Sequence, residues 1–200
     1  DAYEQLNRAL FDHRLPQCLI TLQRRARSYG YFSGDRLDRR DGARCDEIAL
    51  NPVHFRDRSD LETLATLTHE MVHLWQHHFG RPGRARYHNR EWADAMLKIG
   101  LHPSHTGQPG GREPGDTVSH YIIPDGLFER AATSLIASGF RILWRDVSGK
   151  ANTTASSGAR SSRGGRRVKY ACPICGLSAW SRAGAALKCA AHDAVLTPVG

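Results

Sequence analysis

Residues 59–79 read SDLETLATLTHEMVHLWQHHF, and this stretch predicts the central helix of the fold. Ser59 and Glu62 have the capping-box spacing, in which each side chain can bond to the backbone N–H of the other at a helix start. Apolar residues then recur every three or four positions, which is the period of one helix face. This apolar stripe consists of Leu64, Leu67, Met71, Leu74 and Trp75. We therefore expect a helix over residues 60–79 whose apolar stripe faces the core.

The face opposite this stripe carries a metal-binding motif. His69, Glu70 and His73 form the sequence HExxH. Two imidazoles at this spacing project from one side of a helix and can bind the same Zn²⁺, while the glutamate between them can deprotonate the water that the metal activates. The motif therefore predicts a catalytic zinc site of a metalloprotease. His77 and His78, further along the helix, are expected to be exposed.

A catalytic zinc also needs a third protein ligand and an open fourth position. Phe79 and Gly83 stand six and ten positions after His73, which excludes the compact HExxHxxGxxH arrangement. His88 and Glu91 lie 15 and 18 positions after His73 and offer an imidazole and a carboxylate. Spacing alone leaves both residues open as the third ligand.

The other segments predict that the central helix belongs to an α+β domain. Further helices are expected over residues 2–11, 88–99 and 127–138. Extended segments are expected at residues 18–22, 28–33 and 47–50, in a small meander or mixed sheet, with a closing strand at 140–145. Gly34 and the charged run 35–44 should separate the second extended segment from the third.

Charge is unevenly distributed along the 200 residues, whose net charge is +8. Residues 1–146 carry 20 basic and 19 acidic side chains, whereas residues 147–192 carry eight basic and no acidic ones. The segment 148–167 also lacks aromatic residues and any aliphatic residue larger than alanine, so it cannot form a core. We expect a metalloprotease domain over residues 1–146, a flexible basic linker over 147–167 and a small zinc-binding domain over 168–200.

The last segment contains a second metal-binding pattern. Cys172 and Cys175 form a C-x₂-C pair, and Cys189 and His192 form a C-x₂-H pair, with 13 residues between the two pairs. Two such pairs supply the four tetrahedral ligands of a structural Zn²⁺. A domain this small has almost no apolar core, so metal binding would provide most of its folding free energy. The sequence thus predicts two zinc sites, one catalytic and one structural.

Basic and aromatic residues around this second pattern indicate a polyanion partner. Aromatic rings can stack on exposed bases while cations follow the phosphates, which favours single-stranded or distorted DNA without sequence specificity. The candidate DNA-binding residues are Arg163, Arg166, Arg167, Lys169, Tyr170, Trp180, Arg182 and Lys188. Trp180 could alternatively be a packing residue of the small domain.

The composition indicates a soluble intracellular protein. No stretch approaches the roughly 18–20 consecutive apolar residues of a membrane helix, and the five cysteines lack the even framework of a secreted disulfide scaffold. We expect a cytoplasmic monomer, associated with the nucleoid if the chain is bacterial, with no membrane partner.

Two sequence runs resemble a known family. TLTHEMVHLW at residues 66–75, followed by HNREW at residues 88–92, is similar to the SprT-like zinc metalloprotease family, which is related to Spartan. The resemblance covers roughly residues 1–146 together with a C-terminal zinc ribbon. It implies a zincin-like α+β domain in which the HExxH helix packs on a small sheet. It also implies that His88 is the third zinc ligand, and the sequence has Asn89 where the family commonly has glycine.

The same resemblance implies a function. Glu70 would act as general base and acid of a zinc endopeptidase that depends on DNA and cleaves proteins bound or crosslinked to DNA, in DNA–protein crosslink repair. One alternative is a protease of a specific protein target, with the ribbon as docking module. The other is a non-enzymatic DNA-binding zinc protein, whose HExxH site would be closed by a fourth ligand such as Glu91 or His77.

Overall fold

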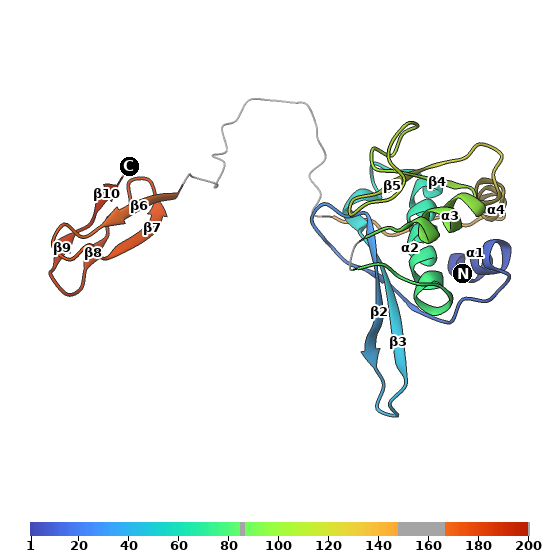
Figure 1. The fold of residues 1–200 in the computed structure, drawn as a ribbon, viewed down its shortest axis with the longest axis horizontal. Helices are drawn as coiled ribbons and strands as arrows, with labels where there is room; N and C mark the ends of the chain where they lie inside the picture. Colours follow the sequence, from blue (N-terminus) through green and yellow to red (C-terminus); the bar gives the residue numbers. More distant parts are fainter. Residues whose placement is uncertain (85–86, 148–166, 200) are drawn as a thin grey trace. The chain divides into compact units, whose positions relative to one another are not determined.

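The computed structural model describes residues 1–84, 87–147 and 167–199, and the chain divides into two compact units, Asp1–Ala151 and Asn152–Gly200 (Figure 1). The described residues form a mixed α+β structure with four α-helices and several small sheets. The predicted linker lies almost entirely outside the described residues, because it covers positions 147–167. Among the helices that the structure describes, none has the length and apolar character that a bilayer span requires.

The first unit is built around α2 (Asp60–Phe79), the helix that the sequence predicts. It contacts the other three helices, which are α1 (Ala2–Phe11), α3 (Arg90–Lys98) and α4 (Leu127–Ala137). Its predicted capping box is confirmed: the Glu62 N–H donates to Ser59 Oγ at 3.2 Å, and the Ser59 N–H donates to Glu62 Oε2 at 2.8 Å. The start of α2 is thus defined by hydrogen bonds between residues that are close in sequence.

A three-stranded sheet lies against α2. Its strands are β1 (Leu19–Leu22), β2 (Gly30–Asp38) and β3 (Arg44–Leu50), in the order β1-β3-β2. Strand β1 runs parallel to β3, whereas β2 runs antiparallel to it, so the predicted mixed sheet is confirmed. Strands β2 and β3 both contact α2. A short 3₁₀ turn, Pro52–His54, follows β3.

The charged run 35–44 separates the two strands only over residues 39–43, so the expected boundaries of this run are wrong. Strands β2 and β3 both extend into this charged run and form a long hairpin, with a register shift between Ser33 and Leu37. Asp35 lies in the left-handed region of backbone conformation, with a φ of 49°, and its N–H donates to Asp46 Oδ1 at 2.8 Å. The register shift is a local irregularity of the kind found in β-bulges. Beyond it the hairpin can continue, because both faces of its outer part are exposed and accommodate charged residues.

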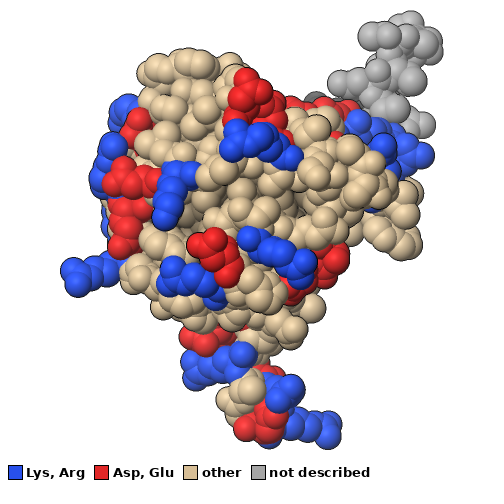
Figure 2. Space-filling model, turned by 90° about the vertical axis from the view of Figure 1, so that its right-hand side faces the viewer, with Lys and Arg blue, Asp and Glu red and all other residues tan. Residues whose placement is uncertain are grey.

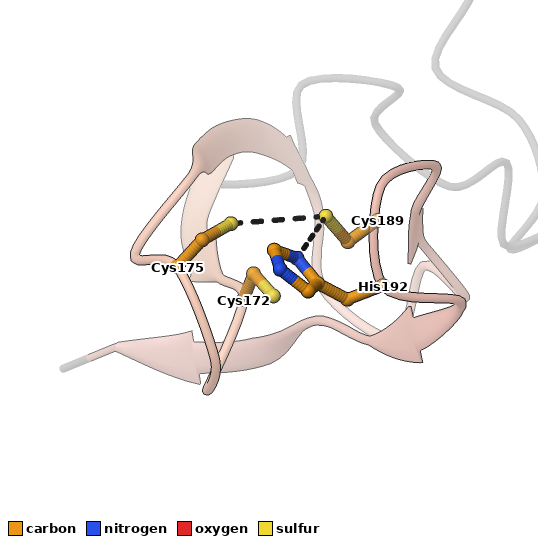
Figure 3. A group of neighbouring side chains, drawn as sticks. All are labelled: Cys172, Cys175, Cys189 and His192. Carbon is orange, nitrogen blue, oxygen red and sulfur yellow. Dashed lines mark hydrogen bonds between the residues drawn. The ribbon is translucent and has the colours of Figure 1, made fainter.

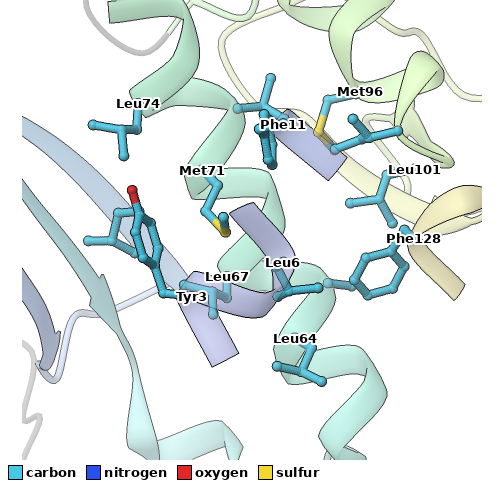
Figure 4. Packing of buried hydrophobic residues seen from close by; sticks show 14 of the residues in the cluster. Tyr3, Leu6, Phe11, Leu64, Leu67, Met71, Leu74, Met96, Leu101 and Phe128 are labelled. Atoms are coloured by element: carbon cyan, nitrogen blue, oxygen red, sulfur yellow. The ribbon is translucent and has the colours of Figure 1, made fainter. Parts of the chain in front are cut away.

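Helix α2 is buried on nearly every side, and its apolar side chains pack with those of α1, α3 and α4 (Figure 4). Residues 63–72 of this helix are buried without interruption, which covers almost three turns and therefore every direction around its axis. The apolar stripe packs on α1 and α4 through residues such as Leu6 and Phe128, both fully buried. The opposite face, with its two histidines, is covered as well, so a buried polar surface lies within the fold.

Two further segments differ from the sequence-based expectations. The predicted closing strand at 140–145 is wrong: Phe140 packs on the core, but Leu143 and Trp144 are 84% and 76% exposed and the segment pairs with no described strand. A short antiparallel pair, β4 (Leu101–Ser104) and β5 (Ser119–Ile122), was not anticipated. Its strands flank the loop rich in proline and glycine, and β5 supplies a side chain to the site described below.

The second unit consists of short strands. The sheet β10-β6-β7 contains β6 (Arg167–Ala171), β7 (Ser178–Arg182) and β10 (Thr197–Val199), and β8 (Lys188–Cys189) pairs with β9 (Ala194–Val195). Its buried core comprises only Tyr170, Cys172, Cys189 and Leu196. Two of these four residues are cysteines of the predicted metal site, so the core and the metal site coincide.

Removing one half of the capping box tests how much it stabilises the first unit. We expect Ser59→Ala to lower the free energy of unfolding by about 1 kcal/mol, because an N-cap hydrogen bond is lost. Urea unfolding followed by far-UV circular dichroism measures this, since the described helices all lie in the first unit. In a cycle with Glu62→Ala, the double variant should lose less than the two single losses added together. Strict additivity would contradict a reciprocal box.

Candidate metal centres

Three histidines that lie apart in the sequence meet in the first unit. His69 and His73 lie one turn apart on α2, and His88 lies just before α3; their ligand atoms are all within 4.8 Å of one another. The sequence predicted that the second helix begins near His88, but the structure begins it at Arg90. His88 instead forms a two-way backbone bridge with Gly115, at 2.8 and 3.0 Å. A loop contact, not a helix, therefore positions this imidazole.

Hydrogen bonds orient two of the rings. His88 Nδ1 lies 3.1 Å from the carbonyl oxygen of Gly115, and His69 Nδ1 lies 3.1 Å from Nδ1 of His120 on β5. Each of these contacts occupies Nδ1 and leaves Nε2 as the free ligand atom. A hydrogen bond on the far nitrogen is the usual way in which a protein fixes the ring orientation and tautomer of a metal-binding histidine.

Trp92 forms an apolar wall beside the three rings. It is fully buried, and its ring lies nearly parallel to that of His73, with centroids 5.2 Å apart. Its centroid also lies 4.8 Å from the ring of His69 and 4.3 Å from that of His88. This indole excludes water from one side of the cluster, which strengthens electrostatic interactions there.

Asn89 has a structural role at the start of α3. Its Oδ1 accepts hydrogen bonds from the Trp92 N–H at 3.0 Å and from Gln76 Nε2 of α2 at 2.8 Å. It therefore caps α3 and ties that helix to α2 at once. A glycine at this position could form neither bond, so the departure from the resembled family pattern strengthens the link between the two helices that flank the cluster.

The buried imidazoles are held in the neutral state that binds metal. Burial lowers the pKa of His69 well below its usual value, and repulsion from neighbouring imidazoles lowers it further. Burial likewise lowers the pKa of His73 to about 3 and that of His120 to about 4. The pKa of His88 is also lowered by burial, although its bond to Gly115 opposes the shift. Neutral imidazoles with free Nε2 atoms suit Zn²⁺.

Glu70 lies within the same buried surface. Burial raises the pKa of its carboxyl to about 8, against the opposing effects of a hydrogen bond from the backbone of Phe32 on β2 and the charge of Arg25. A cation bound by the neighbouring histidines would favour the ionised form. A carboxyl whose pKa lies near neutrality can both accept a proton and give it back, the two tasks of a general base and acid.

The alternative third ligand, Glu91, is not brought to this cluster. Its Oε2 accepts hydrogen bonds from Gln76 Nε2 and from the Arg81 N–H, both at 2.7 Å, and it closes the loop after α2. His77, the other residue considered for closing the site, belongs to a different group of side chains. Tyr121 stacks on His102, with ring planes 9° apart.

The second predicted metal site is also assembled (Figure 3). Cys172, Cys175, Cys189 and His192 place their ligand atoms within 4.8 Å of one another. Cys189 Sγ lies 3.8 Å from Cys175 Sγ and 3.6 Å from His192 Nδ1. Backbone N–H groups of Cys175 and Ile174 lower the pKa of the Cys172 thiol and so favour the thiolate that a metal needs. Three sulfurs and one imidazole fit a structural zinc site.

The predicted DNA-binding residues fall into different environments. Tyr170 is 5% exposed and its hydroxyl bonds Arg182 and Ala185, so the expectation that it stacks on bases is wrong: it is the packing residue of this unit. Trp180 is 64% exposed, and Lys169, Arg182 and Lys188 are exposed as well. Arg163 and Arg166 lie outside the described residues, and of Arg167 only the backbone is described.

The first unit presents a different surface. The face in Figure 2 carries basic and acidic side chains next to one another, not a basic patch. Arg84 pairs with Asp116 at 2.9 Å, and Arg90 pairs with Glu113 at 2.7 Å. This agrees with the near-neutral charge of residues 1–146 and leaves the excess positive charge to the later part of the chain.

Comparison with known proteins gives a family and one short relative. The model of the SprT-like family matches residues 1–110, which is more than half of the chain. An uncharacterized protein from Salmonella typhimurium, described as lying in the mucB 3′ region, is 52% identical over 48 residues. The match covers 24% of this chain and 65% of that protein, which is less than two thirds of its length. No solved structure matches the chain significantly.

Paired substitutions separate the two candidates for the third ligand. We expect His88→Gln to weaken zinc binding at the histidine cluster by about 100-fold or more, since even the loss of a residue that orients a ligand costs about 10–100-fold. Glu91→Gln should leave this affinity unchanged. Zinc content at buffered free zinc concentrations measures both, with circular dichroism to verify folding. Equal losses in the two variants would contradict the assignment.

Proposed function

This chain belongs to the SprT-like family, which is associated with metallopeptidase-type activity, and we propose that it is a zinc-dependent endopeptidase. The observation that carries this proposal is the meeting of three neutral imidazoles beside a buried glutamate. His69, His73 and His88 would hold the zinc, and Glu70 would be the catalytic residue. The packing of α2 on β2 and β3 supports a zincin-like arrangement.

The chemistry would be hydrolysis of a peptide bond. Zinc held by His69, His73 and His88 would supply the Lewis acid that polarises the carbonyl and activates a water molecule. The Glu70 carboxylate accepts the proton of the attacking water and then delivers it to the departing amine. The Phe32 N–H holds this carboxyl in place, and Trp92 keeps bulk water from one side of the site. His120 would orient the His69 ring through their Nδ1 contact.

We propose further that DNA recruits the protein, so that it cleaves proteins bound or crosslinked to DNA. The support comes from the second unit. In β7, Trp180 and Arg182 are two residues apart and share the exposed face, and Lys169 of β6 is directly opposite Trp180 in the antiparallel register. An exposed indole between two cations suits single-stranded or distorted DNA, with stacking on bases and contacts to phosphates.

The competing functions predict different behaviour. A non-enzymatic protein would need a fourth side chain to close the histidine cluster, and Glu91 and His77 are engaged elsewhere. A protease of one protein target, docked through the ribbon, would cleave without DNA. A cytoplasmic, nucleoid-associated role in crosslink repair belongs to the DNA-dependent proposal and would fall with it.

Replacement of the general base tests the enzymatic proposal. With a DNA-bound basic protein as substrate and single-stranded DNA present, we expect cleavage by the unmodified chain and a loss of at least about 100-fold in Glu70→Gln, because general base catalysis contributes about 10²–10⁴-fold. Glu91→Gln is the matched control and should retain activity. Zinc bound at both sites without cleavage by the unmodified chain would favour the binding-protein alternative.

Substitutions in the second unit test the role of DNA. Trp180→Ala should weaken single-stranded DNA binding by about 5- to 150-fold, which corresponds to about 1–3 kcal/mol per stacked base. Lys169→Gln with Arg182→Gln should lower the slope of log affinity against log salt by about 1.4, at about 0.7 for each phosphate contact. The control pair, Arg39→Gln with Arg44→Gln in the hairpin of the first unit, should leave the slope unchanged. Cleavage that persists without DNA would favour the specific-target alternative.

A further inference from the structure

A third group of metal-ligating side chains lies outside both sites described above. Asp46 of β3 and His77 and His78 of α2 place their ligand atoms within 4.8 Å of one another. None of these residues belongs to the HExxH cluster or to the cysteine cluster. From this geometry we infer a second metal site in the first unit, which binds Zn²⁺ or a similar transition-metal ion.

The first reason is the environment of Asp46. Its side chain is only 7% exposed, and among the described residues no lysine or arginine forms an ion pair with it; its partner is His78, with Nε2 and Oδ2 2.6 Å apart. Its other oxygen accepts the Asp35 N–H. A buried carboxylate with so little compensating charge favours a bound cation.

The second reason is the placement of the His77 ring. It lies against the Phe32 ring with centroids 5.5 Å apart. It also lies so close to Gly34 that a Cβ added there would be 2.8 Å from Cε1 of the ring. A glycine at position 34 therefore lets β2 approach the imidazole. This contact holds His77 beside His78, whose ring centroid is 4.9 Å away.

The donor atoms, all within 4.8 Å of one another, lie close to the spacing that a transition-metal ion requires. Two ligands at about 2.0–2.1 Å from one zinc stand about 3.3 Å apart at a tetrahedral angle and never more than about 4.2 Å. Asp46 and His78, now 2.6 Å apart, would separate by less than about 1 Å as the ion replaces the proton between them. Asp35 Oδ2 lies 3.9 Å from His77 Nε2 and adds a further negative charge beside this imidazole. Two imidazoles with a carboxylate suit zinc, copper or nickel better than magnesium or calcium.

An ion at this site would fasten the β2–β3 hairpin to the last turn of α2. Asp46 lies on β3, His77 and His78 lie on α2, and Asp35 lies at the irregular point of β2. The same strand β2 supplies, through Phe32, the backbone hydrogen bond to Glu70. The site is therefore a structural metal site that links the β2–β3 hairpin to the HExxH helix. The bound ion would have no catalytic role.

Zinc stoichiometry of the full chain tests the inference. After equilibration with buffered zinc, His77→Gln should bind one equivalent less than the unmodified chain, and Asp46→Asn should do the same. His77→Gln is the decisive variant, because this side chain is 35% exposed and its loss leaves the Asp46–His78 contact intact. The matched control is His13→Gln, since His13 is 60% exposed and lies outside all three groups. An unchanged stoichiometry in His77→Gln would overturn the inference.

A second comparison separates this site from the proposed catalytic one. His73→Gln should also lose one equivalent, and the double variant with His77→Gln should lose two, because the groups share no ligand. A double variant that loses only one equivalent would mean that the two histidines serve a single ion, and the separate site would be overturned. A loss in His77→Gln alone, with none in His73→Gln, would support this site and instead contradict the catalytic assignment.

Discussion

The burial of α2 on nearly all sides is the constraint on which the first unit depends. A helix that is apolar on one face only would need one covering layer, but here residues 63–72 are buried together with the imidazole of His69 and the carboxyl of Glu70. Polar groups removed from water must find partners. The elements that cover the polar face of α2 supply these partners: His120 on β5 contacts His69, and the backbone of β2 donates to Glu70. Trp92 of α3 covers the same face as an apolar wall. The same burial keeps the imidazoles neutral, so the packing that closes the fold also prepares the histidines for a metal.

One helix thus organises the chemistry of this unit along its length. Its middle turns carry the HExxH residues, and its last turn carries His77 and His78, which face the β2–β3 hairpin through Asp46. An α-helix is stiff and advances about 5.4 Å with each turn. It therefore holds the two groups of side chains at a fixed distance along its axis. The sheet and α3 then determine which side chains join each turn. Strand β2 contributes to both places, through Phe32 and through Asp35.

The second unit follows a different physical logic. Its buried core has four residues, two of which are cysteines that could bind a metal, so little apolar burial is available for folding. With the core that small, large side chains remain outside, and Trp180 stands 64% exposed beside cationic residues. The basic charge of the chain is concentrated in this later part, whereas the surface of the first unit in Figure 2 mixes both signs. Recruitment and hydrolysis are thereby proposed to reside in separate units.

Sequence alone determined the features whose geometry is local. These features depend on spacings of a few residues, over which backbone geometry determines how side chains meet. They are the capping box, the limits of α2, the pair His69 and His73, and the C-x₂-C pair. Features that depend on contacts distant in sequence needed the tertiary structure. His88 reaches the cluster through a bridge to Gly115, 27 residues away, and Asp46 meets His78 across 32 residues. The alternation of residues along the strands could not predict that Tyr170 is buried and Trp180 exposed. In a domain this small, the few neighbouring side chains decide which face of each strand is covered. Nor could it foresee that residues 140–145 find no strand to pair with, since pairing depends on which sheet edge lies within reach.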